Sequence, residues 1–94
     1  MGVQRRAVRL FFNTYYEEDA ERALEALKRA AGGREIRVYR SMVVPELYYV
    51  EIPLDERVSD EEAARLAEAV AEAVRSVSDT VFGVKAYYVG GSGG

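Results

Sequence analysis

The sequence contains no cysteine, no histidine and no tryptophan, and only two of its 94 residues are proline. Without Cys or His the chain cannot form disulfides, thiol nucleophiles, Ser-His triads or the usual zinc and haem ligand sets. This inventory excludes most enzyme classes. We therefore expect no catalytic activity, no cofactor and no bound metal.

Net positive charge and long apolar runs are also missing. The formal net charge is −3, so the chain lacks the overall positive field that attracts nucleic-acid phosphates or anionic lipids. No apolar run approaches the roughly 20 residues that cross a bilayer, and residues 1–6 lack the apolar segment of a secretory signal. We expect a soluble chain, cytoplasmic on recombinant expression, with no nucleic-acid or membrane partner.

Two segments have the apolar periodicity of amphipathic helices. The first is predicted to begin at Thr14, which has the capping-box spacing to Glu17, and to end at Gly32-Gly33. The second is predicted to begin at Ser59, which has the same spacing to Glu62. The apolar stripes are Tyr16, Ala20, Ala23, Leu24, Leu27, Ala30 and Ala31 in the first helix, and Ala63, Leu66, Ala67, Val70, Val74 and Val77 in the second.

Alternating apolar residues predict strands around residues 8–12, 36–39, 48–52 and 82–88. The order strand, helix, strand, strand, helix, strand predicts an α+β ferredoxin-like fold. In this fold a four-stranded antiparallel sheet has the order 4-1-3-2 and carries both helices on one face. We expect residues 1–89 to form a single domain and residues 90–94, Gly-Gly-Ser-Gly-Gly, to form a flexible linker tail.

Taken as a whole, the chain resembles de novo designed ferredoxin-like proteins. The resemblance rests on the capping-box spacings, helices rich in Ala, Glu, Arg and Leu, short loops, the absence of Cys, His and Trp, and the Gly/Ser end. It implies a synthetic chain with no native cellular location and no selected activity. Designs of this class are either fold demonstrations or components made to pair with a strand, a peptide or a second chain.

A natural alternative is the RNA-recognition domain, because Leu10-Phe11-Phe12-Asn13 is similar to its first strand motif. The second motif is incomplete, since residues 46–51 supply only Tyr49 on the required face and Glu51 stands where another ring is needed. Single-stranded RNA binding therefore stays the weaker alternative.

A second natural owner of the fold, the acylphosphatases, places a Gly-rich phosphate loop after the first strand. This chain has Asn13-Thr14-Tyr15-Tyr16 there instead.

Two helices on one face leave the other face of the sheet open. Alternation places on that open face Arg5, Ala7, Arg9, Phe11, Arg37, Tyr39, Ser41, Val43, Leu47, Tyr49, Glu51, Val81, Gly83, Lys85, Tyr87 and Val89.

Aromatic and apolar residues on this face, together with an apolar loop, predict a partner-binding surface. The partner is a protein or peptide, either another molecule or a second copy. Two alternatives remain open: the rings are ordinary strand formers among cross-strand ion pairs, or a curved sheet binds a small molecule. The predicted partner-binding residues are Phe11, Tyr39, Met42, Val43, Val44, Leu47, Tyr49, Val81, Tyr87 and Val89.

The last strand offers a second route to a partner. Residues 80–89 carry one charge, Lys85, so this edge of the sheet is poorly protected against an added strand. The alternative is that Gly83 forms a bulge that spoils the edge for pairing. The acidic runs at residues 17–19 and 60–62 are interpreted as charges that stabilise helix N-termini.

Overall fold

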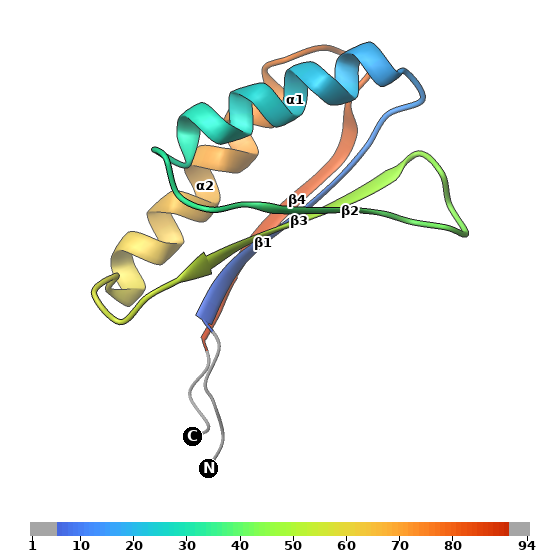
Figure 1. Ribbon diagram of the computed structural model, residues 1–94. Helices are drawn as coiled ribbons and strands as arrows, with labels where there is room; N and C mark the ends of the chain where they lie inside the picture. Colours follow the sequence, from blue (N-terminus) through green and yellow to red (C-terminus); the bar gives the residue numbers. More distant parts are fainter. Residues whose placement is uncertain (1–5, 91–94) are drawn as a thin grey trace.

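The six elements follow one another in the predicted order in a computed structural model that describes residues 6–90 (Figure 1). The predicted open-face position of Arg5 and residues 91–94 of the predicted tail lie outside the described residues. The elements are β1 (Arg6–Asn13), α1 (Glu17–Ala30), β2 (Arg37–Arg40), β3 (Leu47–Leu54), α2 (Asp60–Arg75) and β4 (Phe82–Val89).

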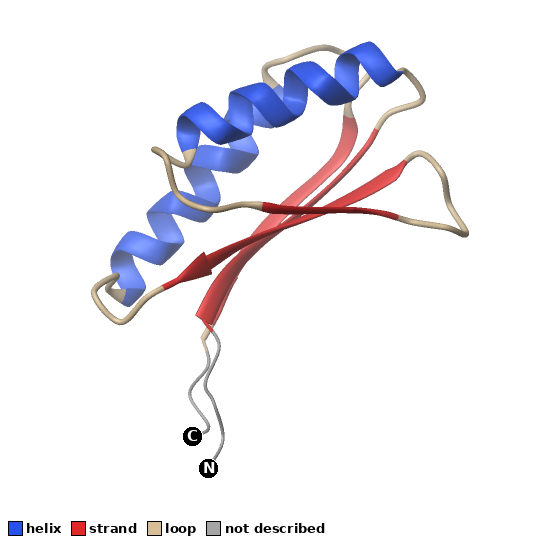
Figure 2. Cartoon of the chain, viewed as in Figure 1, coloured by secondary structure: helices blue, strands red, loops and turns tan. Residues whose placement is uncertain are grey.

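The strands form one antiparallel sheet in the order β2-β3-β1-β4, which is the predicted order read from the other edge. Both helices lie on the same face of this sheet, and the opposite face has no helix over it (Figure 2). The predicted ferredoxin-like layout is confirmed. Neither helix in the described part of the chain is long and apolar enough to span a membrane.

The core lies between the sheet and the helices. Alternation turns one face of each central strand inward, and Phe12 of β1 stacks on Tyr48 of β3 with ring centroids 5.1 Å apart. Helix α2 packs closely over β1 and β4, where its small stripe residues leave little space between helix and sheet, and α1 packs beside α2. The core cluster includes Val8, Leu10, Phe12, Ala20, Ala23, Leu27, Tyr48, Val50, Ile52, Leu66, Ala67, Val70, Val74 and Val81.

The two helix starts differ. At α2 the predicted capping box is confirmed: Ser59 Oγ accepts from Glu62 N at 3.1 Å, and Glu62 Oε1 accepts from Ser59 N at 3.0 Å. At α1 the predicted capping box is wrong. The N-cap is Tyr16, which is exposed rather than part of the buried stripe and makes no side-chain cap.

The reason lies in the backbone of Thr14. Its N–H donates to Glu46 O at 3.0 Å, which carries the β1–β3 pairing past the end of β1. The buried Thr14 hydroxyl accepts from Tyr16 N at 3.3 Å, so the chain turns before the helix begins. The other end of α1 is as predicted, since Gly32 and Gly33 follow the C-cap Ala31 with φ of 67° and 84°.

β2 ends at Arg40, so the prediction that Ser41 and Val43 lie on the open sheet face is wrong, and both residues lie in the β2–β3 loop. Ser41 Oγ accepts from Val43 N at 3.2 Å and from Val44 N at 2.9 Å. These bonds compete with strand pairing and close a turn directly after Arg40.

A bulge interrupts β4 near its start. Phe11 lies opposite Lys85 but Asn13 lies opposite Phe82, so β4 contains one extra residue, and Gly83 has a φ of 63°. The bulge predicted as an alternative is confirmed. It reverses the faces of the residues before it: Val81 is buried in the core, and Phe82 shares the open face with Asn13. The prediction that Val81 lies on the open face is therefore wrong.

Candidate functional site

A row of four aromatic rings, one from each strand, crosses the open face. Ring centroids are 5.5 Å apart for Tyr39 and Tyr49, 4.9 Å for Tyr49 and Phe11, and 6.2 Å for Phe11 and Tyr87. The first three residues are direct cross-strand neighbours, whereas Tyr87 lies opposite Arg9 and reaches Phe11 diagonally. We call these four rings the aromatic row.

The ends of the aromatic row are open to solvent and its centre is partly covered. Tyr39 is 49% exposed and Tyr87 is 41% exposed, while Phe11 and Tyr49 are half-buried. Each contact within the row is stacked, with interplanar angles of 17° to 28°. Neighbouring rings therefore cover part of each other's faces, and the exposed parts of Tyr39 and Tyr87 remain available to a partner.

Charged side chains line one side of the aromatic row. Arg37, Glu51 and Arg9 are cross-strand neighbours, and Arg9 Nε lies 3.5 Å from Glu51 Oε2. This nitrogen is buried without a hydrogen-bond acceptor, so the ion pair is imperfect. Arg37 Nε instead donates to Glu35 Oε2 at 3.0 Å. The predicted cross-strand pairing of charges is thus present in part.

Tyr49 links the aromatic row to the charged side chains beside it. Its hydroxyl donates to Glu51 Oε2 at 3.3 Å. Removal from water raises the pKa of Tyr49, and the adjacent Glu51 carboxylate raises it further, because both disfavour the phenolate. The hydroxyl therefore remains a neutral donor within the face.

The β2–β3 loop adds apolar surface at one end of the sheet. Met42 is 96% exposed and Val43 is 88% exposed. The loop is held by hydrogen bonds from Arg40 Nε to Pro45 O at 2.9 Å and from Leu47 N to Val44 O at 3.0 Å. It projects away from the body of the domain (Figure 1).

The structure places nine of the ten predicted partner-binding residues in three separate groups. Phe11, Tyr39, Tyr49 and Tyr87 form the aromatic row, and Leu47 lies beside it opposite Asn13. Met42, Val43 and Val44 lie in the loop, and Val89 lies opposite Ala7 toward the other end of the sheet. The tenth residue, Val81, lies in the core.

Sequence reasoning missed one exposed aromatic pair. Phe82 is 43% exposed and Tyr15 is 69% exposed, and their ring centroids lie 5.6 Å apart. The signal was Gly83, because a bulge at that glycine shifts the alternation of every residue before it in β4.

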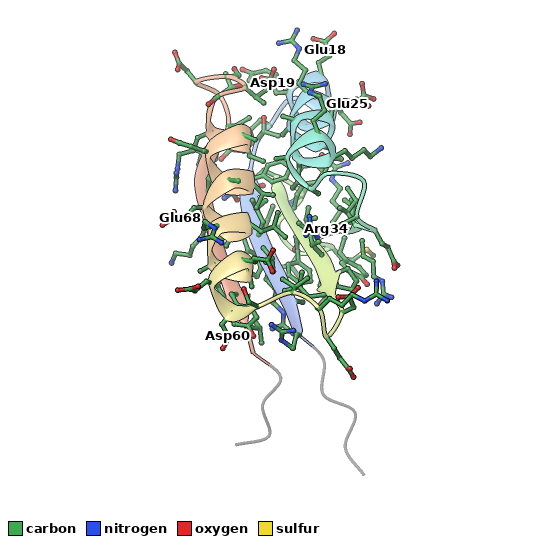
Figure 3. All side chains as sticks on the ribbon, turned by 90° about the vertical axis from the view of Figure 1, so that its left-hand side faces the viewer. Glu18, Asp19, Glu25, Arg34, Asp60 and Glu68 are labelled. Carbon is green, nitrogen blue, oxygen red and sulfur yellow. The ribbon has the colours of Figure 1, made fainter. Side chains whose placement is uncertain are left out.

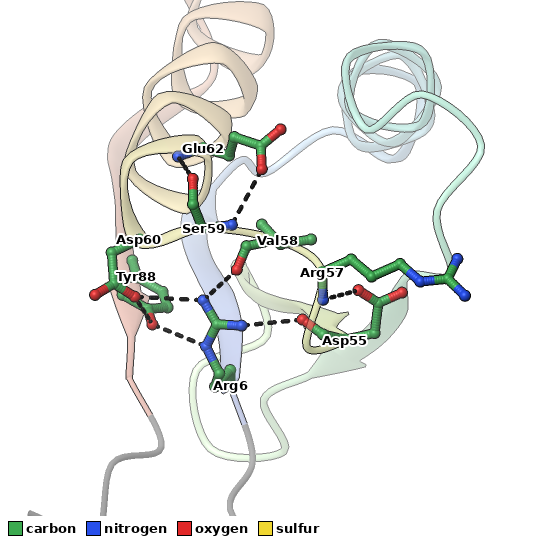
Figure 4. Close-up of polar contacts among 8 residues, drawn as sticks. All are labelled: Arg6, Asp55, Arg57, Val58, Ser59, Asp60, Glu62 and Tyr88. Carbon is green, nitrogen blue, oxygen red and sulfur yellow. Dashed lines mark hydrogen bonds and ion pairs between the residues drawn. The ribbon is translucent and has the colours of Figure 1, made fainter.

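A polar cluster around Arg6 is a second candidate site (Figure 4). Arg6 donates from Nε to the Tyr88 hydroxyl at 3.0 Å and from Nη2 to Val58 O at 2.6 Å. Its Nη1 donates to Asp55 O at 2.9 Å, and the Tyr88 hydroxyl donates to Asp60 Oδ1 at 2.7 Å. The hydrogen bond to Tyr88 is the main cause that raises the pKa of Arg6. The cluster satisfies its own donors, so it ties β1 and β4 to the start of α2.

Three grooves of the described chain lie away from the aromatic row. The largest, about 1000 Å³, runs between α1 and α2, and the others, of about 390 and 350 Å³, lie beside α2 and after β3. None of these three is lined by a ring of the aromatic row. Within residues 6–90 no group of three or more His, Cys, Asp or Glu side chains is placed to hold a metal ion.

Comparison of the chain with protein-family models and with curated protein sequences finds no match. Among solved structures, it is similar to the de novo designed protein Foldit4, with a TM-score of 0.61 and 21% sequence identity. The similarity covers 92% of this chain and 97% of that chain. At this sequence identity the similarity shows that the two chains share a fold. The resemblance to designed ferredoxin-like proteins is thus supported by the solved structure of a designed protein with this fold.

Proposed function

We propose that this chain is a designed binding module without catalytic activity, and that its open sheet face engages a protein partner. The aromatic row is the observation that carries this proposal. A sheet face that contacts only solvent is usually covered by polar residues, which keep the protein soluble. Aromatic rings with arginine nearby are instead typical of interface centres.

The size of the face fits a modest interface. Three strands of eight residues and one strand of four residues cover about 450 Å² on each partner. Such a contact buries about 900 Å² in total, which is the size of a weak or transient interface. The exposed loop residues Met42 and Val43 extend the contact area at one end.

The charge of the face favours an acidic partner. Arg9, Arg37 and Lys85 stand on the open face against the single carboxylate of Glu51, although the whole chain carries a net charge of −3. Two copies packed through this face would bring these cations together, which disfavours self-association there. We therefore propose a partner surface with an apolar centre and an acidic rim.

The alternatives are less well supported. Stacking within the aromatic row covers ring faces that a nucleobase needs, which disfavours RNA. The described grooves do not include the rings, which disfavours a small molecule. The alternative that the chain is a fold demonstration without any ligand is supported by the Arg9–Glu51 ion pair, because this pair makes part of the open face polar.

The test is selection of binders from a displayed library of small proteins with acidic, aromatic-containing surfaces, using the immobilised chain as bait. Enriched binders should lose about tenfold or more in affinity for Tyr39→Ser, because truncation of an exposed interface tyrosine removes a principal contact. The matched control is Tyr16→Ser, since Tyr16 is similarly exposed but lies outside the open face.

Amide NMR shifts provide the second readout. A bound partner should perturb residues of the aromatic row and leave the outer faces of α1 and α2 unchanged. Enriched binders that affect only the helices, or that bind wild type and Tyr39→Ser equally, would contradict the proposal. Recovery of no binder at all would favour the fold-demonstration alternative.

A further inference from the structure

The outer edge of β4 is open. β4 is the last strand of the sheet and pairs only with β1, and its residues after the bulge continue in regular register from Lys85 to Val89. The other edge strand, β2, has four residues, of which Arg37 and Arg40 are charged. β4 is therefore the longer and less charged edge, and its unpaired backbone groups can accept a further strand.

A groove lies beside this edge on the helix side. It has a volume of about 390 Å³. Ala86 of β4 and the alanines of α2 contribute only methyl groups, while the rim carries charge. Glu68 points away from α1 (Figure 3). The groove is lined by Ala67, Glu68, Ala71, Glu72, Arg75 and Ala86.

The position of the groove matches the geometry of an added strand. Side chains of neighbouring strands line up across a sheet, so a strand paired with β4 places alternate side chains on the helix side, next to Ala86. A medium-sized aliphatic side chain at that position would lie in the groove against the alanines and be removed from water by α2.

We propose that the β4 edge and this groove bind an extended peptide strand. The strand carries an aliphatic side chain over the alanines and Lys or Arg at the adjoining helix-side positions. This site is separate from the open face and is a second binding activity of the chain.

Charge complementarity specifies the basic residues. Glu68 makes no ion pair among residues 6–90, and the contact from Glu72 Oε1 to Arg75 Nη1 is long at 3.9 Å. Two carboxylates thus face one guanidinium at the rim, and a cationic side chain from the added strand compensates the excess.

The same charges disfavour a second copy as the occupant. Antiparallel pairing of two β4 edges would bring the two α2 helices side by side, with Glu68 and Glu72 of one copy close to those of the other. Like charges at this contact, and a net charge of −3 on each copy, oppose the assembly.

The probe is a fluorophore-labelled peptide, acetyl-Ser-Lys-Thr-Val-Thr-Lys-Ser-amide, titrated with the full chain and followed by fluorescence anisotropy. Its Val and two Lys residues share one side of the extended strand. Saturable binding is expected. Two analogues N-methylated at alternate sets of residues should differ, because only one set of amides faces β4.

Two variants locate the site. Glu68→Lys should weaken binding about fivefold, since it replaces an attraction with a repulsion of similar size. The matched control Glu25→Lys, on the exposed face of α1, should bind the peptide as wild type does. Ala86→Leu should weaken binding, because the larger side chain occupies the part of the groove next to β4, and circular dichroism should show both helices intact.

Several results would overturn this proposal: no saturable binding, equal binding of the two N-methylated analogues, or unchanged binding to Glu68→Lys. A dimer of the free chain that Ala86→Leu dissociates would instead identify a second copy as the occupant. Tyr39→Ser should leave peptide binding intact, so failure at this site and failure at the open face are separately visible.

Discussion

Asn13 lies opposite Phe82, and its Nδ2 donates to the Phe82 carbonyl oxygen at 3.3 Å. The side chain of Asn13 also occupies the space over Gly83, where an added Cβ would lie 2.6 Å from Nδ2. Gly83 has the positive φ that a side chain disfavours. Asn13 and Gly83 together therefore stabilise the bulge, which places Val81 in the core and Phe82 on the open face.

We predict that Gly83→Ala destabilises the protein by more than its backbone conformation alone requires. Positive φ costs a non-glycine residue about 1–2 kcal/mol, and the contact with Asn13 adds to this. Gly33→Ala is the matched control, because Gly33 has a φ of 84° but open space around its Cα. Urea denaturation should show the larger loss for Gly83→Ala.

The double variant Asn13→Ala/Gly83→Ala separates the two causes. Removing the Asn13 amide relieves the contact, so adding Gly83→Ala to Asn13→Ala should cost no more than Gly33→Ala costs in the wild type. If the cost of Gly83→Ala is the same with and without Asn13, the contact is irrelevant to the bulge.

Phe11 and Phe12 are adjacent in sequence but should respond differently to truncation. Phe12 is fully buried and stacks on Tyr48, so Phe12→Ala should cost about 3–5 kcal/mol of unfolding free energy. Phe11 is half-buried on the open face, and Phe11→Ala should cost about 1–2 kcal/mol. Chemical denaturation measures both; equal losses would show that the aromatic row belongs to the core rather than to a binding surface.

The Glu62 carboxylate should make stability depend on pH. Its pKa is lowered, chiefly because it accepts a hydrogen bond from the backbone of Ser59. A folded pKa below the unfolded value means that the stabilisation is present above the unfolded pKa and is lost as pH falls through the folded one. Wild type should therefore exceed Glu62→Gln in stability at neutral pH and lose that advantage in acid.

Thermal unfolding of both proteins between pH 7 and about pH 2 gives the measurement. Glu61→Gln is the control, because Glu61 is also in the first turn of α2 but takes no part in the capping box. An advantage over Glu62→Gln that stays constant through the acid range would mean that the carboxylate acts through packing rather than through its charge.

The capping box wrongly predicted at the start of α1 shows what local sequence cannot predict. The spacings Thr14 to Glu17 and Ser59 to Glu62 are identical, yet only the second forms a capping box. Nothing near Thr14 in the sequence distinguishes it. Its backbone N–H is taken by Glu46, 32 residues away, and this pairing exists only once the sheet has formed.

The sequence by itself determined the order of the elements, the inward residues of the central strands and the membership of the aromatic row. These follow from periods of 2 and 3.6 residues, which the local backbone imposes on any chain. The tertiary structure decided what register controls: the stacking of Tyr39, Tyr49 and Phe11, the exchange of Val81 and Phe82, and the groove beside Ala86. Register joins segments that are distant in the chain, so it is fixed by how their side chains pack together and not by either segment alone.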